Sequence, residues 1–226
     1  KSIPITDEHC PRDTALEAIL NPYKQEAEKK YSRVVTRLKR QLTHPSWYQE
    51  TELGGFLADI LQESLRLDMM LVGSGSIRVT ELGPIILFSN LTECLPYDDS
   101  AIALWVTGAQ LKKMILYMLR DEVWDGAHCE FFQFSEGVRV VYDKASHAFK
   151  EFSLNEEPIA DEKIYKIGLQ YYFYLNMKDF FSVSHEEVEP NGKPRRVATS
   201  CREVLDEYLS CHQGLDHRIS DRLQIL

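Results

Sequence analysis

The segment from Ala101 to Met118 constrains the fold more than any other part of this sequence. Residues 101–106 form an apolar run, and Thr107 and Gln110 follow with the spacing of a helix capping box. Apolar residues then recur at i, i+3, i+4 and i+7, namely Leu111, Met114, Ile115 and Met118. A strand that leads directly into an amphipathic helix predicts a sheet with a helix packed on it.

The chain after residue 46 alternates the same two signals. Strands are predicted over residues 69–72, 85–88, 101–106, 149–154, 163–169 and 222–226. Helices are predicted over residues 54–67, from Asn90, after Thr107 and after Ser200. Residues 131–142 favour a hairpin that turns near Glu136 and Gly137. Hairpins mixed with helices indicate an α+β fold with mixed sheets flanked by helices.

The N-terminal part has a different composition. Residues 13–42 are rich in Ala, Leu, Glu, Lys and Arg, which favours a long helix capped by Asp13 or Thr14. Pro22 is expected to break or kink it, so two consecutive helices are an alternative. A helix that is charged nearly all round is typical of a bridge between domains. We therefore expect an interdomain linker helix region over 1–45 and a globular domain over 46–226.

Composition and charge exclude some classes of function. The formal charge is −9, from 26 Lys and Arg against 35 Asp and Glu, which argues against general nucleic-acid binding. The basic residues between 24 and 40 are interpreted as a solvated helix face. No apolar run approaches the ~20 residues of a membrane helix, so no membrane partner is expected. The chain opens without Met, and we expect it to be a piece of a longer polypeptide.

Metal-ligating and nucleophilic patterns are missing from the sequence. The five cysteines have no paired spacing, which favours a reducing compartment such as the cytoplasm. The seven histidines are scattered, and Cys211-His212 and His185-Glu186-Glu187 are the only local candidates for ligands. Both lie in polar stretches where exposed side chains are the ordinary interpretation. We therefore predict no metal site and no catalytic residue in this chain.

The loop from Gly73 to Arg78 is the best candidate for ligand chemistry. A strand that delivers the small residues Gly-Ser-Gly-Ser exposes backbone N–H groups to an anion, and the following Arg adds a charge-assisted contact. A tight turn followed by a surface Arg explains the same residues without a ligand.

Further motifs give this loop a context. Five segments are similar, in order, to motifs of one family: residues 50–59 to "ETNLGNLIAD", 73–78 to "NGGGIR", 83–97 to "GPITY…LPF", 106–112 to "LTGAQLK", and 132–143 to "FLQVSG…YD". The chain thus resembles the C-terminal domain of the 5'-nucleotidase, UDP-sugar hydrolase and 2',3'-cyclic-nucleotide phosphodiesterase family, as a divergent member.

The resemblance implies a division of labour between two domains. An N-terminal calcineurin-like metallophosphoesterase domain in cis holds two divalent metal ions that activate water against a phosphate ester. The C-terminal domain binds the nucleotide or nucleoside substrate, and a long helix joins the two. The metal ligands then lie outside this chain, which alone is expected to be inactive. Many relatives are exported, so the resemblance leaves export open beside the cytoplasm.

The resemblance also places residues in the binding site. It puts Arg78 at the phosphate, with Gly75 in the preceding loop, and Tyr97 and Tyr172 at two rings that stack on the base. Such stacking contributes about 1–3 kcal/mol per base. Two acidic residues complete the set, Asp99 where some members contact the base and Asp179 at the ribose if one residue is inserted.

Several departures from the family pattern leave an alternative open. Gly73 stands where the motif has Asn, and Trp47 stands where an Arg is expected before the first motif. Loss of one phosphate-binding Arg removes a contact worth about 1.5–3 kcal/mol. The alternative is a non-catalytic ligand-binding or interaction module with a degenerate nucleotide pocket. Metal-binding motifs upstream of this chain would favour the enzyme.

Overall fold

A computed structural model describes residues 5–6, 10, 12–124 and 129–226. The α-helices are α1 (Thr14–Tyr31), α2 (Glu52–Leu65), α3 (Phe88–Cys94), α4 (Gly108–Met118), α5 (Tyr171–Leu175), α6 (Met177–Phe181), α7 (His185–Val188) and α8 (Cys201–Cys211). The longer strands are β1 (Val34–Arg37), β3 (Met69–Gly73), β6 (Ala101–Thr107), β8 (Val138–Asp143), β9 (Ala148–Leu154), β11 (Ile164–Gln170) and β12 (Arg195–Ala198). The shorter strands are β2 (Leu42–Thr43), β4 (Glu81–Leu82), β5 (Ile85–Leu87), β7 (Phe132–Phe134), β10 (Glu157–Pro158) and β13 (Leu223–Ile225). Three 3₁₀ turns, η1 (Ser74–Ser76), η2 (Asp121–Val123) and η3 (Glu189–Asn191), complete the set.

A five-stranded mixed sheet forms the centre of the molecule. Its strand order is β12-β6-β11-β3-β7, and only the β11–β3 pair is parallel. Successive side chains of a strand point to opposite faces, and β3 shows this plainly. Met69 and Leu71 are buried in the core on one face, and Met70 and Val72 in the core on the other. The sheet is therefore covered on both faces.

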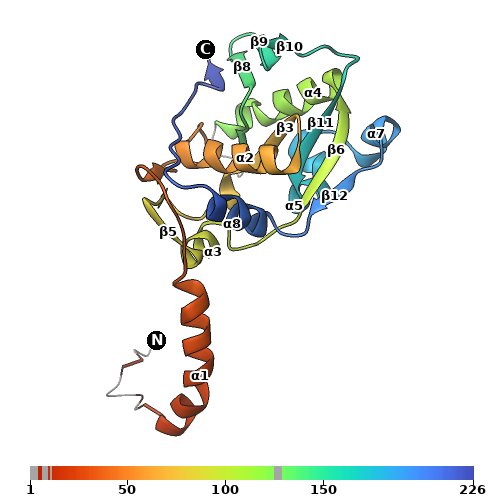
Figure 1. The fold of residues 1–226 in the computed structure, drawn as a ribbon. Helices are drawn as coiled ribbons and strands as arrows, with labels where there is room; N and C mark the ends of the chain where they lie inside the picture. The colour runs from red at the N-terminus through yellow and green to blue at the C-terminus, as the bar shows by residue number, and fades with distance from the viewer. Residues whose placement is uncertain (1–4, 7–9, 11, 125–128) are drawn as a thin grey trace.

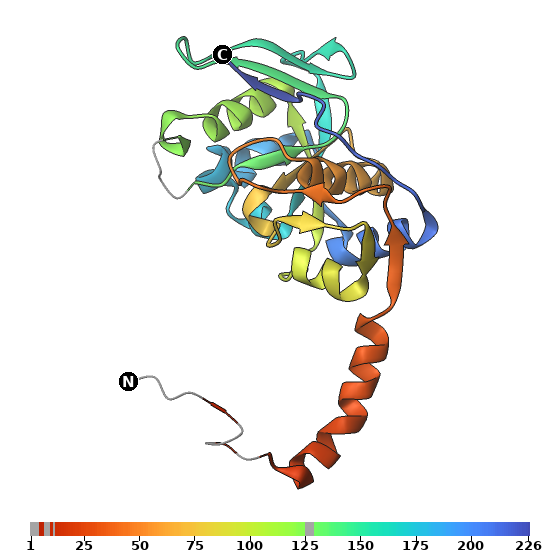
Figure 2. The ribbon, with the colours of Figure 1, turned by 90° about the vertical axis from the view of Figure 1, so that its left-hand side faces the viewer.

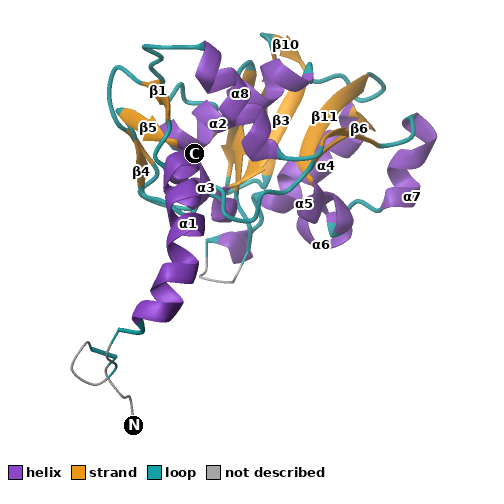
Figure 3. Cartoon of the chain, turned by 60° about the horizontal axis from the view of Figure 1, so that its bottom comes forward, coloured by secondary structure: helices purple, strands orange, loops and turns teal. Residues whose placement is uncertain are grey.

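Different layers cover the two faces (Figures 1 and 3). The helices α2 and α8 pack on one face, where Leu57 and Leu205 are buried. On the other face lie α4 and a four-stranded sheet of order β10-β9-β8-β13, whose Val140 and Phe152 join the core with Met114. This architecture confirms the predicted α+β class with mixed sheets flanked by helices.

The strand-to-helix unit after Ala101 is confirmed in detail. Strand β6 ends at Thr107, and α4 begins at Gly108. The Thr107 hydroxyl accepts a hydrogen bond from the Gln110 N–H, while the Gln110 side chain accepts one from the Thr107 N–H. This reciprocal capping box satisfies two backbone groups at the start of the helix. Ser200 likewise caps α8 by accepting from the Glu203 N–H.

The expected helix over residues 13–42 is wrong at its C-terminal end. Helix α1 is capped by Asp13 as predicted but ends at Tyr31. Val34 to Arg37 then form β1, which pairs with β5, because β-branched residues suit a strand. Pro22 does not divide α1, which runs through it as one helix. A proline removes one backbone donor, and the surrounding good helix formers tolerate that loss. In Figures 1 and 2, α1 projects away from the rest of the molecule.

The expected hairpin over residues 131–142 is also wrong. Strand β7 pairs with β3 in the central sheet, whereas β8 pairs with β9 and β13 in the other sheet. The connecting residues bind the central sheet and α2, because the Ser135 N–H donates to the Met70 carbonyl of β3 and the Glu136 N–H donates to Asp59 of α2. Gly137, with φ of +82°, then turns the chain into the second sheet.

The short helix expected to start at Asn90 begins two residues earlier, at Phe88. The Asn90 side chain lies in the first turn and accepts a hydrogen bond from the Leu87 N–H at 2.9 Å. Asn90 therefore supports the helix start from inside the helix.

Candidate functional site

A cavity of about 610 Å³ opens beside the end of β3. Its lining residues come from four separate segments and are Gly75, Ser76, Arg78, Tyr97, Asp99, Glu130, Gln170, Tyr171, Tyr172, Phe173 and Leu175. Five of the six predicted binding residues thus meet in one pocket, although up to about a hundred residues separate them in the sequence. We call this cavity the β3 pocket.

The small-residue loop after β3 packs closely against side chains that line the β3 pocket. Gly73 has no room for a side chain, since a Cβ there would collide with the Phe173 ring. Its N–H donates to the buried Gln170 side chain at 3.0 Å. Gly75 is similarly close to Glu130, and its N–H donates to the Glu130 carboxylate at 2.7 Å. One N–H of the expected anion-binding loop is therefore already bonded to a carboxyl group of the protein itself.

Arg78 lines the β3 pocket and contacts two aromatic rings. Its guanidinium carbon is 5.5 Å from the centre of the Trp47 ring and 5.9 Å from that of Tyr97. One guanidinium nitrogen donates to the Gly75 carbonyl at 3.2 Å. Cation–π contacts of this kind hold the flat faces of a guanidinium and leave N–H groups at its edge for an anion.

The two predicted stacking residues are the open aromatic rings of the pocket. Tyr97 is 74% exposed and Tyr172 is 58% exposed. Within the run from Tyr171 to Tyr174, Phe173 instead belongs to the core and packs edge-on against Phe132. An exposed ring beside a cavity offers a face to a flat ligand such as a base. Of this aromatic run, Tyr172 is thus the residue with a face available for stacking.

Asp99 forms hydrogen bonds that position Tyr172. One of its carboxylate oxygens accepts a hydrogen bond from the Tyr172 N–H at 2.6 Å, and the other accepts from the Ser100 N–H at 2.8 Å. These bonds join the segment before β6 to the start of α5. Asp99 lines the pocket and also fixes the helix that carries Tyr172.

Asp179 is placed apart from the other predicted residues. It is an exposed residue of α6 and does not line the β3 pocket. The helix returns Phe181 to the core, so Asp179 faces away from that buried side. The ribose role expected for Asp179 has no support in this geometry.

Glu130 and Trp47 are residues of this site whose roles the sequence did not indicate. Glu130 is partly buried, and burial raises the pKa of its carboxyl to about 7, although the Gly75 N–H and Arg78 both favour the ionised form. A single Glu beside two Phe residues carries no motif that would reveal this. Trp47 stands where the family pattern has an Arg, and its contact with Arg78 follows from tertiary structure alone.

The comparison with protein families decides the relationship of this chain. A model of the 5'-nucleotidase C-terminal domain matches residues 31–185, well over half of the sequence. The chain belongs to this family. The metallophosphoesterase YunD of Bacillus subtilis (strain 168) is 31% identical over 110 residues, which are 47% of this chain and 23% of YunD.

Solved structures share the fold of this 5'-nucleotidase C-terminal domain. A 5'-nucleotidase precursor from Thermus thermophilus superimposes with a TM-score of 0.75 at 20% identity, over 99% of this chain and 45% of that protein. The NAD nucleotidase NadN of Haemophilus influenzae gives a TM-score of 0.71 at 15% identity, over 95% of this chain and 41% of NadN. The sequence thus spans less than half the length of each relative.

A metal centre has no ligand set in the described parts of this family member. Over the described parts of the chain, no group of three or more His, Cys, Asp or Glu side chains is placed to hold a metal ion. The two local candidates are engaged elsewhere: His185 bonds the Tyr174 carbonyl, and His212 stacks on Tyr208 and bonds its carbonyl. His9 and His128 lie outside the described residues. Among the described helices, none combines the length and apolarity needed to cross a membrane.

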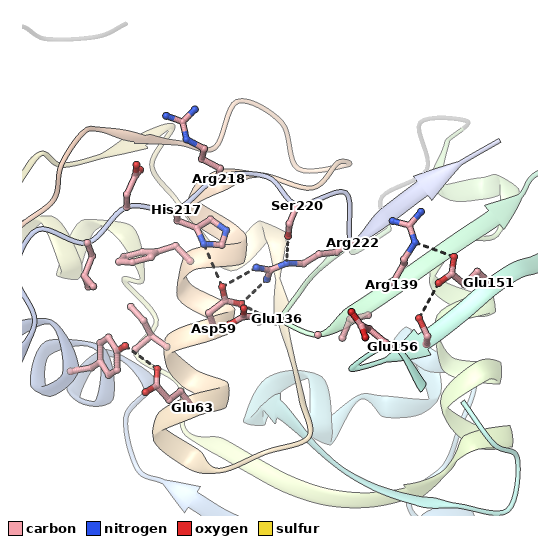
Figure 4. Close-up of a pocket in the computed structure, with 18 residues that line it drawn as sticks. Asp59, Glu63, Glu136, Arg139, Glu151, Glu156, His217, Arg218, Ser220 and Arg222 are labelled. Carbon is pink, nitrogen blue, oxygen red and sulfur yellow. Dashed lines mark hydrogen bonds and ion pairs between the residues drawn. The ribbon is translucent and has the colours of Figure 1, made fainter. Parts of the chain in front are cut away.

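A second cavity, of about 690 Å³, lies between α2, β8 and the segment before β13 (Figure 4). Two of its arginines are already engaged in ion pairs, Arg222 with Asp59 and Arg139 with Glu151. The described residues that line it offer no exposed aromatic face comparable with Tyr97 or Tyr172. We therefore take the β3 pocket as the candidate ligand site of this domain.

Proposed function

We propose that this chain is the substrate-recognition domain of a two-domain, metal-dependent phosphohydrolase that acts on nucleotides or related phosphate esters. In this proposal the hydrolytic reaction belongs to an N-terminal metallophosphoesterase domain in cis, which supplies two divalent metal ions. The relatives, among them a metallophosphoesterase and two nucleotidases, are about twice as long as this chain, which supports this division.

One observation carries the proposal: in a member of this family, Arg78 and the open rings of Tyr97 and Tyr172 line one pocket. The rings provide faces for a base, and the edge of the Arg78 guanidinium provides N–H donors for a phosphate. A nucleoside monophosphate needs both kinds of contact at the same time. The pocket therefore matches a 5'-nucleotide better than it matches a base or a phosphate alone.

Calorimetric titration of the purified chain with AMP, adenosine and UDP-glucose tests the proposal. We expect binding of AMP and adenosine, and we expect Tyr97→Ala to weaken both, by about 1–3 kcal/mol. Arg78→Ala should weaken AMP more than adenosine, since only AMP carries the phosphate, by about 1.5–3 kcal/mol. Tyr23→Ala is the matched control, because Tyr23 is an exposed ring on α1, away from the pocket.

Equal weakening of AMP and adenosine by Arg78→Ala would remove Arg78 from the phosphate role. No binding of any of the three ligands at millimolar concentration would contradict the nucleotide proposal.

A second candidate function is a non-catalytic binding module. Two observations favour it: Trp47 stands where the family pattern has an Arg, and Glu130 already occupies the Gly75 N–H. The upstream sequence separates the two candidates, because a phosphohydrolase requires the metal-binding motifs there and a binding module does not.

A further inference from the structure

Among the described residues, Glu130 is the carboxylate of the β3 pocket that contacts the small-residue loop. Its Oε1 accepts the Gly75 N–H at 2.7 Å. Its Oε2 would lie 2.9 Å from a Cβ at position 75, so glycine is needed there for the carboxylate to approach. Gly75 and Glu130 are 55 residues apart in the sequence, so the tertiary fold creates this contact.

The position of Glu130 conflicts with a phosphate at the same loop. A ligand phosphate that bonds the Arg78 guanidinium and the loop N–H groups would meet the charge of Glu130 at short range. In a partly buried pocket this repulsion is weakly screened. A neutral sugar or base meets no such repulsion.

We infer that Glu130 is a specificity-determining residue that holds back phosphate-bearing ligands relative to the corresponding nucleosides when its carboxylate is charged. This inference rests on the proposed nucleotide-binding function of the β3 pocket. Loss of the Glu130 charge is then the event that admits a phosphate beside Gly75 and Arg78.

The charged and the protonated forms of Glu130 interconvert in a pH range in which ligand binding can be measured. Burial raises the pKa of its carboxyl to about 7. Other charged or titratable groups lie in or near the β3 pocket. Its lining includes Arg78, Tyr97, Asp99, Tyr171 and Tyr172. Beside it, His44 bonds the Ser74 carbonyl of the loop, and Cys129 accepts a hydrogen bond from Arg120. Burial lowers the pKa of His44, so its ring is neutral at the higher pH of the test below and does not mimic Glu130 there.

The test compares wild type with Glu130→Gln by calorimetric titration with AMP and with adenosine at about pH 8.5 and about pH 5.5, on either side of the Glu130 pKa. Glutamine keeps an oxygen that accepts the Gly75 N–H and removes the charge. At the higher pH we expect the ratio of AMP to adenosine affinity to rise about tenfold in the variant. At the lower pH the two proteins should give the same ratio, because Glu130 is then protonated in wild type. Glu136→Gln, which removes a charge outside the β3 pocket, is the control and should leave the ratio unchanged.

An unmutated measurement covers the case in which Glu130→Gln does not fold. Adenosine 5'-sulfate keeps one negative charge across this pH range, so its affinity relative to adenosine should fall in wild type as pH rises through about 7.

The outcomes separate the inference from the function on which it rests. If wild type binds both ligands but Glu130→Gln leaves the ratio unchanged at the higher pH, the inference is wrong and the proposed function stands. A rise of similar size that persists at the lower pH also overturns it, since the effect is then independent of the charge. If wild type binds neither AMP nor adenosine, the proposed function fails, and the inference fails with it.

Discussion

Arg222 illustrates how one side chain near the end of the sequence joins distant elements. Its guanidinium forms two hydrogen bonds with the Asp59 carboxylate of α2, at 2.6 and 2.9 Å, and one with the Phe134 carbonyl of β7, at 2.7 Å. The Arg222 side chain is only 5% exposed. Because a charge removed from water depends on its partners, this cluster fixes the C-terminal segment on α2 and β7.

Replacement of Arg222 by Ala should cost about 3 kcal/mol of unfolding free energy, since the Phe134 carbonyl loses its Arg222 donor and the Asp59 carboxylate keeps only the Glu136 N–H and the His217 ring as polar neighbours. Arg139→Ala is the matched control. Arg139 pairs with Glu151, but the two side chains are 43% and 44% exposed, so its loss should cost less than about 1 kcal/mol. Urea denaturation measures both, and equal costs would refute the role given to Arg222.

Helices α4 and α1 differ in the contacts that stabilise them. Helix α4 begins with the Thr107–Gln110 capping box and buries Leu111, Met114 and Ile115 against the central sheet. Helix α1 has a cap of similar geometry at Asp13, which accepts from the Ala15 and Leu16 N–H groups at 3.0 Å, yet none of its residues is buried. A cap on a packed helix contributes to the stability of the whole domain, and a cap on an unpacked helix does not.

Thr107→Ala should therefore lower the unfolding free energy by about 1 kcal/mol, while Thr107→Ser should restore most of it. Asp13→Ala removes an equivalent cap and should leave the main unfolding transition unchanged, with only a local loss of helix. Urea denaturation followed by tryptophan fluorescence reports the domain transition, and circular dichroism reports the helix content. A loss of domain stability in Asp13→Ala would show that α1 is coupled to the core.

At the scale of the whole molecule, the chain consists of one layered body and a projecting helix (Figure 2). The body starts at β1, because Val35, Leu38 and Leu42 are already buried in the core beneath α2 and α8. The contact of α1 with the body includes the Tyr31 ring, which lies 5.7 Å from that of Phe88. The boundary at residue 45 between linker and domain stays a prediction, but the core itself includes residues before it.

Deletion of residues 1–30 should leave the midpoint of urea unfolding nearly unchanged, since it removes no buried side chain of α1 and keeps Tyr31. Deletion of residues 215–226 removes fewer residues but also removes Arg222 and β13, which pairs with β8. We expect that deletion to lower the midpoint strongly. If the N-terminal deletion is the more damaging of the two, the description of α1 as a projecting helix is wrong.

The sequence by itself determined the elements that depend on near neighbours. The apolar periodicity of α4, the capping residues Thr107 and Ser200, and the small-residue loop at Gly73 were all predictable. The reason is that a helical turn, a cap and a tight loop involve groups within about four residues of one another. The ordered family motifs extended this local information to the fold as a whole.

Tertiary structure alone decided how distant segments meet. Val34 to Arg37 became a strand because β5 provides a partner, and β7 and β8 joined different sheets because Met70 and Asp59 bind the residues between them. Glu130 entered the β3 pocket although no motif contains it, and Asp179, which matches the family's ribose position only with one inserted residue, does not line that pocket. Pairing partners, burial and the charge of a neighbour are properties of three-dimensional contacts, and they are not written in any short stretch of sequence.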